Sequence, residues 1–389
     1  MKVIGILGGG QLGQMLGLAA IPLGLRCIFY EQADNPCAAA AGKVYRNLTK
    51  FAEAADIFTY EFENIPQHIT THPLIKNKLL PPLKPLRIAA DRSQEKTLFA
   101  KLGIPTVNWL PLPATMPSTP NIPSVEDLAD AAQTIGLPMI IKTTTMGYDG
   151  KGQVVVRTQK DLAKAARDLK SIAKEHRPVN VLPANIKAKA TAPSSPFIVE
   201  QMVNFKRELS IISARDRQGN IAHYPIAENH HQNGILYSTY APALISATRL
   251  RQLHSWMEKL LTHLSYTGIL TLEVFETSKG LLANEMAPRV HNSGHWTIEG
   301  TISSQFENHI RAVAGMKLGS TQARGYSKMF NLVGRAEPRL AQITDAHLHL
   351  YGKQARRGRK LGHLTYTAAS KAQLRKISSS MESHESFYS

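Results

Sequence analysis

Two glutamates in strand-like surroundings are the residues of this 389-residue sequence whose chemistry stands out first. Glu273 and Glu285 lie among Leu, Val, Asn and Met, where an unpaired carboxylate is unfavourable. Residues 270–275 and 281–286 have the composition of strands and 277–280 that of a turn, which predicts a hairpin. Carboxylates about 4 Å apart would repel by about 4 kcal/mol, a cost that a Mg²⁺ ion bridging a nucleotide phosphate would remove. The alternative is a pair of strand-edge glutamates in ordinary ion pairs.

Cationic and hydrogen-bonding side chains follow the second strand of this hairpin. Arg289, His291, Asn292 and His295 are close together in a segment that a Ser-Gly dipeptide tightens into a loop. The two histidines have i,i+4 spacing, but Ser-Gly between them disfavours a zinc pair on one helix face. The region 268–296 is therefore predicted to be the part around which the rest of the chain is organised.

The composition limits the classes of function. The chain has 46 Lys and Arg against 29 Asp and Glu, a net charge of +17, but the basic residues are spread out, with the densest cluster at 353–360. No aromatic residues alternate with them, which favours phosphorylated small substrates over nucleic acid. No apolar run approaches the ~20 residues that span a bilayer. Residues 2–7 lead into a glycine turn rather than a signal peptide, and only Cys27 and Cys37 are present, so we expect a cytoplasmic protein.

The N-terminus has the pattern of a βαβ unit. A buried strand at 2–7 is followed by glycines at 8, 10 and 13, a helix to residue 20 and a second strand that ends at Glu31. This spacing matches the dinucleotide fingerprint, although any ligand phosphate can use a glycine turn at a helix N-terminus.

A second parallel strand is predicted within 56–64. Glu61 and Asn64 come at its carboxyl end, where ligands bind in such sheets. These two side chains are either the second wall of the same pocket or caps of the following loop.

The remaining segments predict a linker, an insertion and several regular elements. A Pro-rich stretch at 111–123 is expected to be a linker, which places a domain boundary near residue 110. Strands at 138–143 and 153–157 flank a glycine-rich loop at 146–152 whose lysine could close over a triphosphate. Residues 171–196 are polar and are expected to form an inserted surface loop. Helices are predicted at 91–102 and 256–264, strands at 197–203 and 207–214, and a β-rich region after 315.

Seven motifs in order resemble those of the ATP-grasp superfamily and, within it, the 5-(carboxyamino)imidazole ribonucleotide synthases. They are GGGQLGQM, TYEFENIP, DRSQEK, GYDGKGQ, ENHHQNGIL, NEMAPRVHNSGHWT and YGKQARRGRKLGH, and the resemblance covers about residues 3–367. It implies an α/β ATP-grasp fold with an N-terminal doubly wound parallel-sheet (pre-ATP-grasp) domain at 1–110. An ATP-grasp domain would follow at 111–318, with a lid subdomain at 111–203, and a small β-rich C-terminal domain at 319–380.

The same resemblance implies a reaction. Bicarbonate and ATP would give carboxyphosphate, and the amine of aminoimidazole ribonucleotide would capture the carboxyl group, in purine biosynthesis. The products would be 5-(carboxyamino)imidazole ribonucleotide, ADP and phosphate, with ATP and Mg²⁺ as cofactors. The resemblance also implies a homodimer that binds small-molecule substrates, and the composition disfavours nucleic acid and membrane as partners.

Site residues follow from the resemblance position by position. The bicarbonate and carboxyphosphate site would be formed by Arg289, His291 and Asn292, and the metal ligands would be Glu273 and Glu285. The substrate nucleotide would contact Gly9, Gln11, Leu12, Glu61 and Asn64, with Lys353, Arg356 and Lys360 as its phosphate clamp. ATP would contact Arg92, Lys142, Gly147, Tyr148, Asp149, Gly150, Lys151, Gly152, Gln153, Glu200, Gln201, Met202, Val203, Glu208, His231, Asn284 and Glu285.

The sequence departs from the family pattern in three places. Residues 143–146 replace a basic, glycine-doubled start of the closing loop, Arg357 stands where the clamp usually has proline, and the 171–196 insertion has no counterpart. Three alternatives remain at this point. They are a formate-dependent glycinamide ribonucleotide transformylase, an NAD-dependent dehydrogenase that would explain only the glycine fingerprint, and a catalytically silent nucleotide-binding protein.

Overall fold

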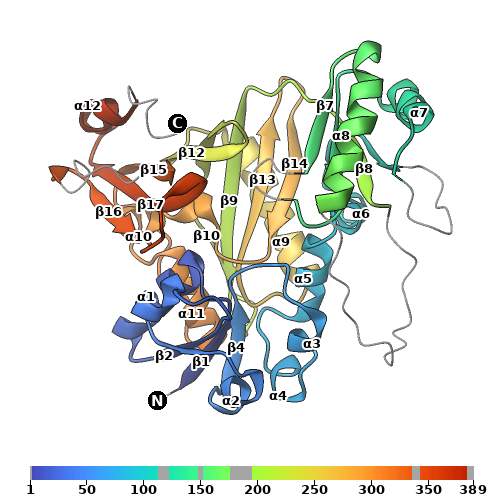
Figure 1. Cartoon of the computed structure of the whole chain (residues 1–389). Helices are drawn as coiled ribbons and strands as arrows, with labels where there is room; N and C mark the ends of the chain where they lie inside the picture. The colour runs from blue at the N-terminus through green and yellow to red at the C-terminus, as the bar shows by residue number, and fades with distance from the viewer. Residues whose placement is uncertain (1, 113–121, 148–151, 176–194, 335–341, 383–389) are drawn as a thin grey trace. The chain divides into compact units, whose positions relative to one another are not determined.

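The computed structural model of the chain describes residues 2–112, 122–147, 152–175, 195–334 and 342–382 (Figure 1). The chain divides into two compact units. Unit 1 comprises Met1–Ala89, Arg207–Glu276 and Glu285–Ser389, and unit 2 comprises Ala90–Lys206 and Thr277–Asn284.

A parallel sheet begins unit 1 and confirms the predicted βαβ start. Its strand order is β3-β2-β1-β4, and every neighbouring pair is parallel. Alternate residues of β1 enter different apolar clusters, because successive side chains of a strand point to opposite faces. Ile6 packs with Met15 and Leu16 of α1, whereas Leu7 packs with Phe51 and Phe58. The elements are β1 (Val3–Leu7), α1 (Gln11–Ala20), η1 (Ile21–Leu23), β2 (Arg26–Tyr30), η2 (Cys37–Ala40), β3 (Lys43–Tyr45), α2 (Leu48–Glu53), β4 (Ile57–Tyr60), α3 (Gln67–Thr70), α4 (Pro73–Lys76) and α5 (Leu83–Ala89).

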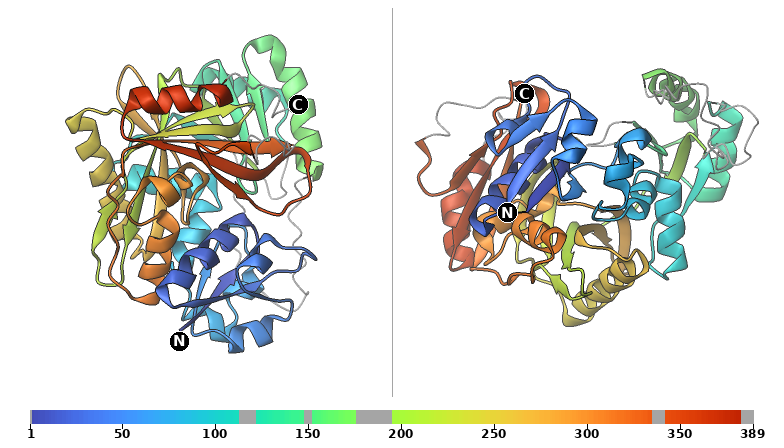
Figure 2. Two further views of the ribbon diagram at one scale, coloured as in Figure 1. Left: turned by 90° about the vertical axis from the view of Figure 1, so that its left-hand side faces the viewer. Right: turned by 90° about the horizontal axis from the view of Figure 1, so that it is seen from below.

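The second sheet of unit 1 is long and antiparallel. Its strand order is β14-β13-β9-β11-β12-β15-β17-β16, with β10 paired to β9. The predicted β-rich C-terminal region continues this sheet, because β15 pairs with β12, and α12 packs on β15 and β17 (Figure 2). The elements are β9 (Arg207–Arg215), β10 (Ile221–His223), β11 (Ala227–Gln232), β12 (Ile235–Ala241), α9 (Ala247–His263), β13 (Gly268–Glu276), β14 (Leu281–Ala287), η4 (Asn292–Gly294), α10 (Thr297–Gly300), α11 (Gln305–Ala314), β15 (Tyr326–Gly334), β16 (His347–Leu350), β17 (Arg356–Ala368) and α12 (Lys371–Glu382).

Unit 2 is a four-stranded antiparallel sheet covered by two helices. The strand order is β5-β8-β6-β7, and α7 and α8 pack on one face through Leu128, Leu162 and Phe197 (Figure 1). Ser124 begins α7 with a capping box, in which its side chain and that of Asp127 bond each other's backbone N–H. The elements are α6 (Arg92–Lys101), β5 (Trp109–Leu112), α7 (Val125–Ile135), β6 (Met139–Thr143), β7 (Gln153–Val156), η3 (Gln159–Asp161), α8 (Leu162–Glu175) and β8 (Phe197–Gln201).

Several predicted boundaries were wrong, each because packing extends or shortens a local pattern. The expected linker at 111–123 begins inside β5, and its residues 113–121 lie outside the described chain. The expected insertion at 171–196 begins inside α8, which ends at Glu175, and its residues 176–194 are likewise outside the description. At its other end, Ser195 is buried and donates a hydrogen bond to the carbonyl of Leu112. The helix expected at 256–264 starts nine residues earlier, at Ala247, where Ser246 caps it.

One buried histidine joins three elements of unit 1. The ring of His309 on α11 accepts a hydrogen bond from the Ile269 N–H at Nδ1 (3.2 Å), and its Nε2 lies 2.7 Å from the hydroxyl of Thr59 on β4. Burial lowers the pKa of His309 to about 3. The imidazole is therefore neutral at pH 7, and both nitrogens are satisfied.

We predict an acid-induced loss of stability that depends on His309. A histidine in the unfolded state has a pKa of about 6.5. Below that pH the unfolded state binds a proton that the native state does not, so the free energy of unfolding falls. Between pH 6.5 and 4.5 the loss from this residue should be on the order of 2 kcal/mol. Urea unfolding at both pH values should show a smaller difference in His309→Gln than in the unchanged protein. Equal differences in the two proteins would contradict the assignment.

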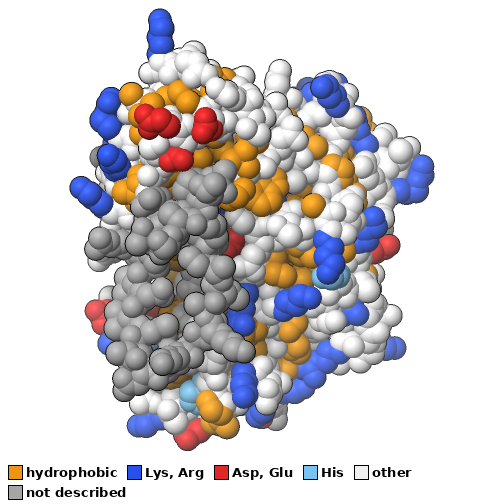
Figure 3. Space-filling view, turned by 90° about the vertical axis from the view of Figure 1, so that its right-hand side faces the viewer, with side chains coloured by type: hydrophobic (Ala, Val, Ile, Leu, Met, Phe, Trp, Pro, Cys, Tyr) orange, Lys and Arg blue, Asp and Glu red, His pale blue; other side chains and the backbone are white. Residues whose placement is uncertain are grey.

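Positive charge is scattered over the face of the molecule that Figure 3 shows. Figure 3 shows Lys and Arg side chains distributed among apolar and polar groups over one face. Among the described residues no helix is long and apolar enough to span a bilayer.

Candidate active site

The two glutamates singled out by the sequence interact in unit 1. Glu273 lies on β13, and Glu285 lies on β14, the neighbouring strand in the sheet. The Glu273 side chain is 13% exposed. Burial and then the charge of Glu285 hold the pKa of Glu273 well above its usual range. Because the two carboxylates lie on neighbouring strands and repel each other, the pair has the donor chemistry of a divalent-cation site.

His291 is oriented toward Glu273 by its neighbours. Its Nδ1 accepts a hydrogen bond from the Ser293 N–H (3.3 Å) and lies 2.9 Å from the Ser293 hydroxyl. Burial, followed by the charges of Arg289 and Lys360, lowers the pKa of His291 well below its usual range. The neutral ring therefore carries its proton on Nε2, which lies 3.7 Å from Glu273 Oε1. Gln305 fixes the backbone of His291 by bonding both its N–H (3.0 Å) and its carbonyl (2.6 Å).

Arg289 is held by a carboxylate that sequence reasoning passed over. Its Nε and Nη2 donate to the two oxygens of Glu63 at 2.6 and 2.9 Å, a bidentate pair, and Nη1 donates to the Val290 carbonyl at 3.1 Å. The pair fixes the guanidinium plane. Asn292 lies three residues further on, and both polar atoms of its amide are buried and have no protein partner in the described chain. Such an amide is suited to a small polar ligand.

Glu208 and His231, both predicted to contact ATP, lie side by side. His231 Nδ1 is 2.8 Å from Glu208 Oε2, from neighbouring strands β11 and β9. Burial opposes protonation of His231, but Glu208 and Glu273 together raise its pKa above the usual value. The two groups therefore form a polar pair near the Glu273 carboxylate.

The glycine turn after β1 is occupied by a side chain of the protein itself. Glu61, directly after β4, accepts hydrogen bonds from the N–H of Gly10 and, at 2.5 Å, from that of Gly13. Glu31 accepts from the N–H of Gly9 at 3.1 Å. A Cβ at Gly8, where φ is +110°, would lie 2.4 Å from the Glu61 side chain. Because Glu61 fills the anion position at the start of α1, a dinucleotide pyrophosphate cannot use these N–H groups as the fingerprint suggests.

Lys353, which lies in the C-terminal part of the chain, contacts this turn through Gln11. Its ammonium donates to the side chain of Gln11, at the start of α1, and lies 5.6 Å from the ring centre of Tyr351. Burial lowers the pKa of Lys353, while Cys37 and Glu61 oppose that change. The predicted partners Gln11, Glu61 and Lys353 are therefore brought together, and Cys37 accompanies them.

The other predicted substrate residues lie around this group with varied exposure. Gly9 is buried, Leu12 packs against the apolar core, and Asn64 is exposed after β4. Arg356 and Lys360 lie on strand β17 rather than on a surface loop; Arg356 is exposed and Lys360 half-buried.

Unit 2 contains a buried cluster of two lysines and one carboxylate. Glu200 on β8 accepts from Lys96 of α6 at Oε1 (2.8 Å) and from Lys142 of β6 at Oε2 (2.6 Å). Burial alone would raise the pKa of Glu200, but the two ammonium groups lower it to about 2. The cluster carries one net positive charge, and it includes the predicted phosphate-binding Lys142. Glu200 was predicted to contact ATP, and its side chain forms ion pairs with these two lysines.

The start of the predicted closing loop is anchored in unit 2. Arg92 donates to the Gly147 carbonyl (3.4 Å), and its N–H donates to the Thr144 carbonyl (2.9 Å). Gly152 has φ +72°, and a Cβ there would lie 2.8 Å from Thr143. Four predicted loop residues, Tyr148, Asp149, Gly150 and Lys151, lie outside the described residues. Gln153 is exposed at the start of β7.

The strand expected at 197–203 ends at Gln201, so Met202 and Val203 lie beyond it. The Gln201 side chain accepts from Asn108 at 3.2 Å, and the N–H of Met202 donates to the Pro138 carbonyl at 3.0 Å. The carbonyl of Asn284, in the residue before Glu285, lies 3.5 Å from the Lys96 ammonium.

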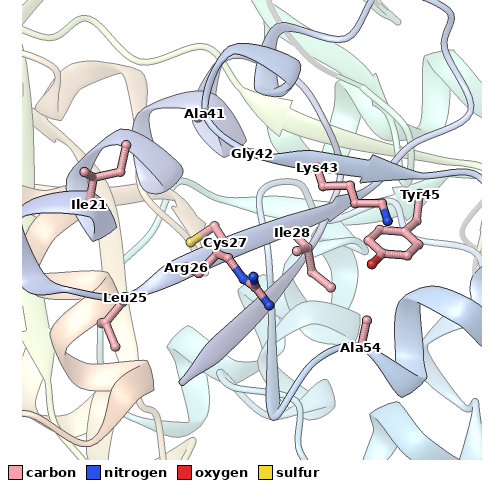
Figure 4. A pocket seen from close by; sticks show the side chains of 10 residues that line it. All are labelled: Ile21, Leu25, Arg26, Cys27, Ile28, Ala41, Gly42, Lys43, Tyr45 and Ala54. Atoms are coloured by element: carbon pink, nitrogen blue, oxygen red, sulfur yellow. The ribbon is translucent and has the colours of Figure 1, made fainter. Parts of the chain in front are cut away.

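A separate cavity of about 320 Å³ lies in the N-terminal part of unit 1 (Figure 4). It contains none of the predicted site residues. Its lining consists of Ile21, Leu25, Arg26, Cys27, Ile28, Ala41, Gly42, Lys43, Tyr45 and Ala54.

Sequence reasoning missed three residues that contact the predicted site residues, and two of them had a signal in the sequence. Glu63 lies in the same TYEFENIP motif as Glu61, and Lys96 lies one helical turn after Arg92. Gln305 had no local signal.

Within the described ranges no group of three or more His, Cys, Asp or Glu side chains is arranged to hold a metal. A cation at Glu273 and Glu285 would therefore use these two carboxylates together with ligand oxygens.

The chain is similar to proteins of a known family along its length. Three family models match: the ribonucleotide synthetase preATP-grasp domain at 1–90, the ATP-grasp domain at 97–306 and the phosphoribosylaminoimidazole carboxylase C-terminal domain at 327–377. The chain is 40% identical over 380 residues to N5-carboxyaminoimidazole ribonucleotide synthase of Pseudomonas aeruginosa, covering 95% of this chain and 96% of that one.

Solved structures give the same result over the full chain. The synthetase from Thermus thermophilus is 39% identical, with a TM-score of 0.83 over 97% of each chain. The synthase from Aspergillus clavatus, solved in complex with ADP and 5-aminoimidazole ribonucleotide, is 26% identical, with a TM-score of 0.81 over 98% of this chain and 97% of that chain. On the strength of these matches along its whole length, this chain belongs to the N5-carboxyaminoimidazole ribonucleotide synthase family of ATP-grasp ligases.

Proposed function

We propose that the protein catalyses the ATP-dependent carboxylation of aminoimidazole ribonucleotide to 5-(carboxyamino)imidazole ribonucleotide in purine biosynthesis. The observation that carries the proposal is the group formed by Glu273, Arg289 and His291, which combines a carboxylate, a fixed guanidinium and a neutral imidazole. Membership of the synthase family supports the same reaction.

Arg289 and His291 suit the first step, in which a bicarbonate oxygen attacks the γ-phosphorus of ATP and ADP leaves. The guanidinium, already oriented by Glu63, would bind the anion, and the Nε2–H of His291 would donate to an oxygen on which charge develops. The amide of Asn292, whose polar atoms have no hydrogen-bond partner among the described residues, supplies a further donor and acceptor. The carboxyphosphate that forms then delivers its carboxyl carbon, directly or as CO₂, to the exocyclic amine, with release of phosphate and a proton.

We also infer that Mg²⁺ binds Glu273 and Glu285. The raised pKa of Glu273 beside a second carboxylate fits a divalent cation. When bound, the ion neutralises phosphate charge during transfer. The lysine cluster Lys96, Lys142 and Glu200, with its net positive charge, suits the phosphates of ATP.

The nucleotide substrate is proposed to bind where Gln11, Glu61 and Lys353 meet, with Arg356 and Lys360 as further phosphate contacts. The contact of Lys353 with Gln11 and its half-buried position support a role in fixing one phosphate oxygen.

Phosphate release tests the proposal as a whole. With ATP, Mg²⁺ and bicarbonate, release should depend on aminoimidazole ribonucleotide and should be accompanied by ¹⁴C fixed from labelled bicarbonate into an acid-labile product. Formate in place of bicarbonate should give no turnover. Turnover with formate and glycinamide ribonucleotide, or no turnover with any of these substrates, would overturn the assignment.

Lys353→Ala should separate the two phosphate sites. We expect the KM for the ribonucleotide to rise at least tenfold and the KM for ATP to stay within twofold, because Lys353 contacts Gln11 of the proposed ribonucleotide pocket. One charge-assisted hydrogen bond is worth about 1.5–3 kcal/mol, which corresponds to about ten- to a hundred-fold. Steady-state kinetics with each substrate varied in turn provides the measurement. Lys376→Ala, an exposed lysine on α12, is the control, and a change in the ATP constant alone would refute the division.

Three further features remain proposals from the family resemblance. They are a homodimer, which sedimentation can test, a cytoplasmic location, which agrees with the free thiols of Cys27 and Cys37, and domain boundaries near residues 110 and 318.

A further inference from the structure

Lys96 is the buried ammonium of the lysine cluster that is proposed to bind the phosphates of ATP. It lies on α6 within unit 2, and its side chain is 1% exposed. Lysine is almost never fully buried unless it is paired, so its environment must compensate the charge. The compensation comes from Glu200 Oε1 at 2.8 Å, with the hydroxyl of Thr106 at 3.3 Å as a neutral acceptor.

Glu200 is shared between this buried lysine and one that is partly accessible. Lys142 is 17% exposed, whereas the Glu200 side chain is 4% exposed, so within the cluster Lys142 is the member open to a ligand. Each carboxylate oxygen has one ammonium partner. Without Lys96, the whole negative charge of Glu200 would act on Lys142, and the cluster would be neutral. With Lys96 present, the cluster has one positive charge in excess, and the accessible end of that charge is Lys142.

Lys96 also holds the chain next to a proposed metal ligand. Its ammonium lies 3.5 Å from the carbonyl of Asn284, which directly precedes Glu285. The neighbouring Thr106 hydroxyl donates to the Ala283 carbonyl at 2.7 Å, and the Ala283 N–H donates to the Pro105 carbonyl at 2.7 Å. Hydrogen bonds therefore connect residues 283–284 of β14 to residues 105–106, which follow α6.

We propose that Lys96 is a positioning residue for ATP, which by sharing the charge of Glu200 leaves Lys142 with positive charge available to a phosphate oxygen. The proposal rests on the proposed function, in which Lys142 contacts ATP. Lys96 itself is too buried to contact a ligand and acts through Glu200. The proposal differs from a purely structural role because it concerns the net charge of the cluster rather than its packing.

Lys96→Met tests the proposal, because methionine keeps the unbranched shape and removes the charge. We expect the KM for ATP, and the Kd for ADP by calorimetry, to rise tenfold or more, while the KM for the ribonucleotide changes less than twofold. Lys101→Met, an exposed lysine on the same helix, is the matched control and should change neither constant.

A double variant tests the charge argument independently of packing. In Lys96→Met with Glu200→Gln the cluster again carries one positive charge, on Lys142, so at least half of the lost ADP affinity on a logarithmic scale should return. A purely structural role of Lys96 predicts the opposite, because a second buried partner is removed and the melting temperature falls further. Unchanged nucleotide affinity in a folded Lys96→Met, or a double variant that binds no better than the single one, would overturn the proposal.

The double variant also covers the case in which Lys96→Met does not fold. In the double variant no carboxylate is left without its buried lysine partner, so this protein is expected to fold. The proposal is then tested by comparing its ADP affinity with that of Glu200→Gln. In that comparison the double variant should bind ADP more weakly, because it has one positive charge fewer, and equal affinity would overturn the proposal. Failure of the proposed function is distinguishable, since the unchanged protein would then show no ribonucleotide-dependent phosphate release.

Discussion

Replacement of Glu285 by Gln is expected to reduce turnover by about 10³-fold or more at saturating Mg²⁺ while the protein stays folded. The physical reason is the carboxylate pair on β13 and β14, in which each group is needed to balance a divalent charge. Loss of metal stabilisation worth several kcal/mol corresponds to a rate loss of this size. Glu273→Gln should be nearly as damaging. Steady-state phosphate release with Mg²⁺ varied over a wide range is the measurement.

The stability of the same variant distinguishes a metal site from an ordinary structural ion pair. Because Glu285 raises the pKa of Glu273, removing its charge relieves repulsion and offsets the loss of its attraction to Arg289, so without Mg²⁺ the melting temperature should change little. The rise in melting temperature on adding Mg²⁺ and nucleotide should disappear. If Glu285 served only as a partner in a structural ion pair, its replacement would instead lower the melting temperature. Glu53→Gln, which changes an exposed carboxylate on α2, should preserve activity and the Mg²⁺ effect.

The pH dependence of metal binding follows from the same pair. Since the pKa of Glu273 lies above its usual range, Mg²⁺ must displace a proton at pH values below that pKa. The apparent Kd for Mg²⁺ should therefore fall as pH rises, by up to about tenfold per pH unit. A Kd that is constant from pH 6 to pH 8, or full activity of Glu285→Gln, would contradict the paired-carboxylate interpretation.

Replacement of Arg289 by Lys is the second change expected to have a large effect, a loss of kcat of about 10²-fold to 10³-fold with little change in fold. A fixed donor aimed at developing charge is worth about this much in other enzymes. Lysine keeps the charge but cannot reproduce the bidentate contact that sets the guanidinium plane against Glu63 at 2.6 and 2.9 Å. Single-turnover measurement of ATP cleavage with bicarbonate should locate the loss in the first chemical step.

Two more variants separate the chemistry of Arg289 from its structural contribution. Arg289→Met removes the bidentate contact of Glu63 and should cost about 2 kcal/mol of stability, less than the about 3–5 kcal/mol of a fully buried pair because Glu63 is 26% exposed. Adding Glu63→Gln removes the negative charge that Arg289 had compensated, so the double variant should regain most of that stability but none of the turnover. Recovery of turnover in the double variant would show that Arg289 acts only on the fold.

Local patterns predicted the elements that carry the site. The glycine turn after β1 and the hairpin of β13 and β14 depend on residues close together in the chain, whose turn propensities and alternation are visible without tertiary information. The same holds for Glu273 and Glu285, because a short hairpin brings its strands side by side. The resemblance of the motifs to a known family added the reaction and the site residues, which local periodicity alone does not supply.

Local patterns were less successful at the ends of elements. The helix expected at 256–264 begins at Ala247, and α8 continues into the expected insertion as far as Glu175. Amphipathic periodicity marks the buried turns of a helix, whereas its exposed turns carry little signal.

Only the tertiary structure decided which polar groups meet. The pairs Glu61 with Gly13, Arg289 with Glu63 and Lys353 with Gln11 are 48, 226 and 342 residues apart in the chain, and no local spacing relates their members. Their consequences are specific. Glu61 takes the N–H groups that a dinucleotide would need, which reverses the simplest interpretation of the glycine fingerprint. Glu200 and Lys96 likewise meet only because α6 and β8 pack in one unit. Sequence determines which strands and turns form because backbone propensity is local, but the protonation and charge of a site depend on burial and on distant partners, and these exist only after the chain has folded.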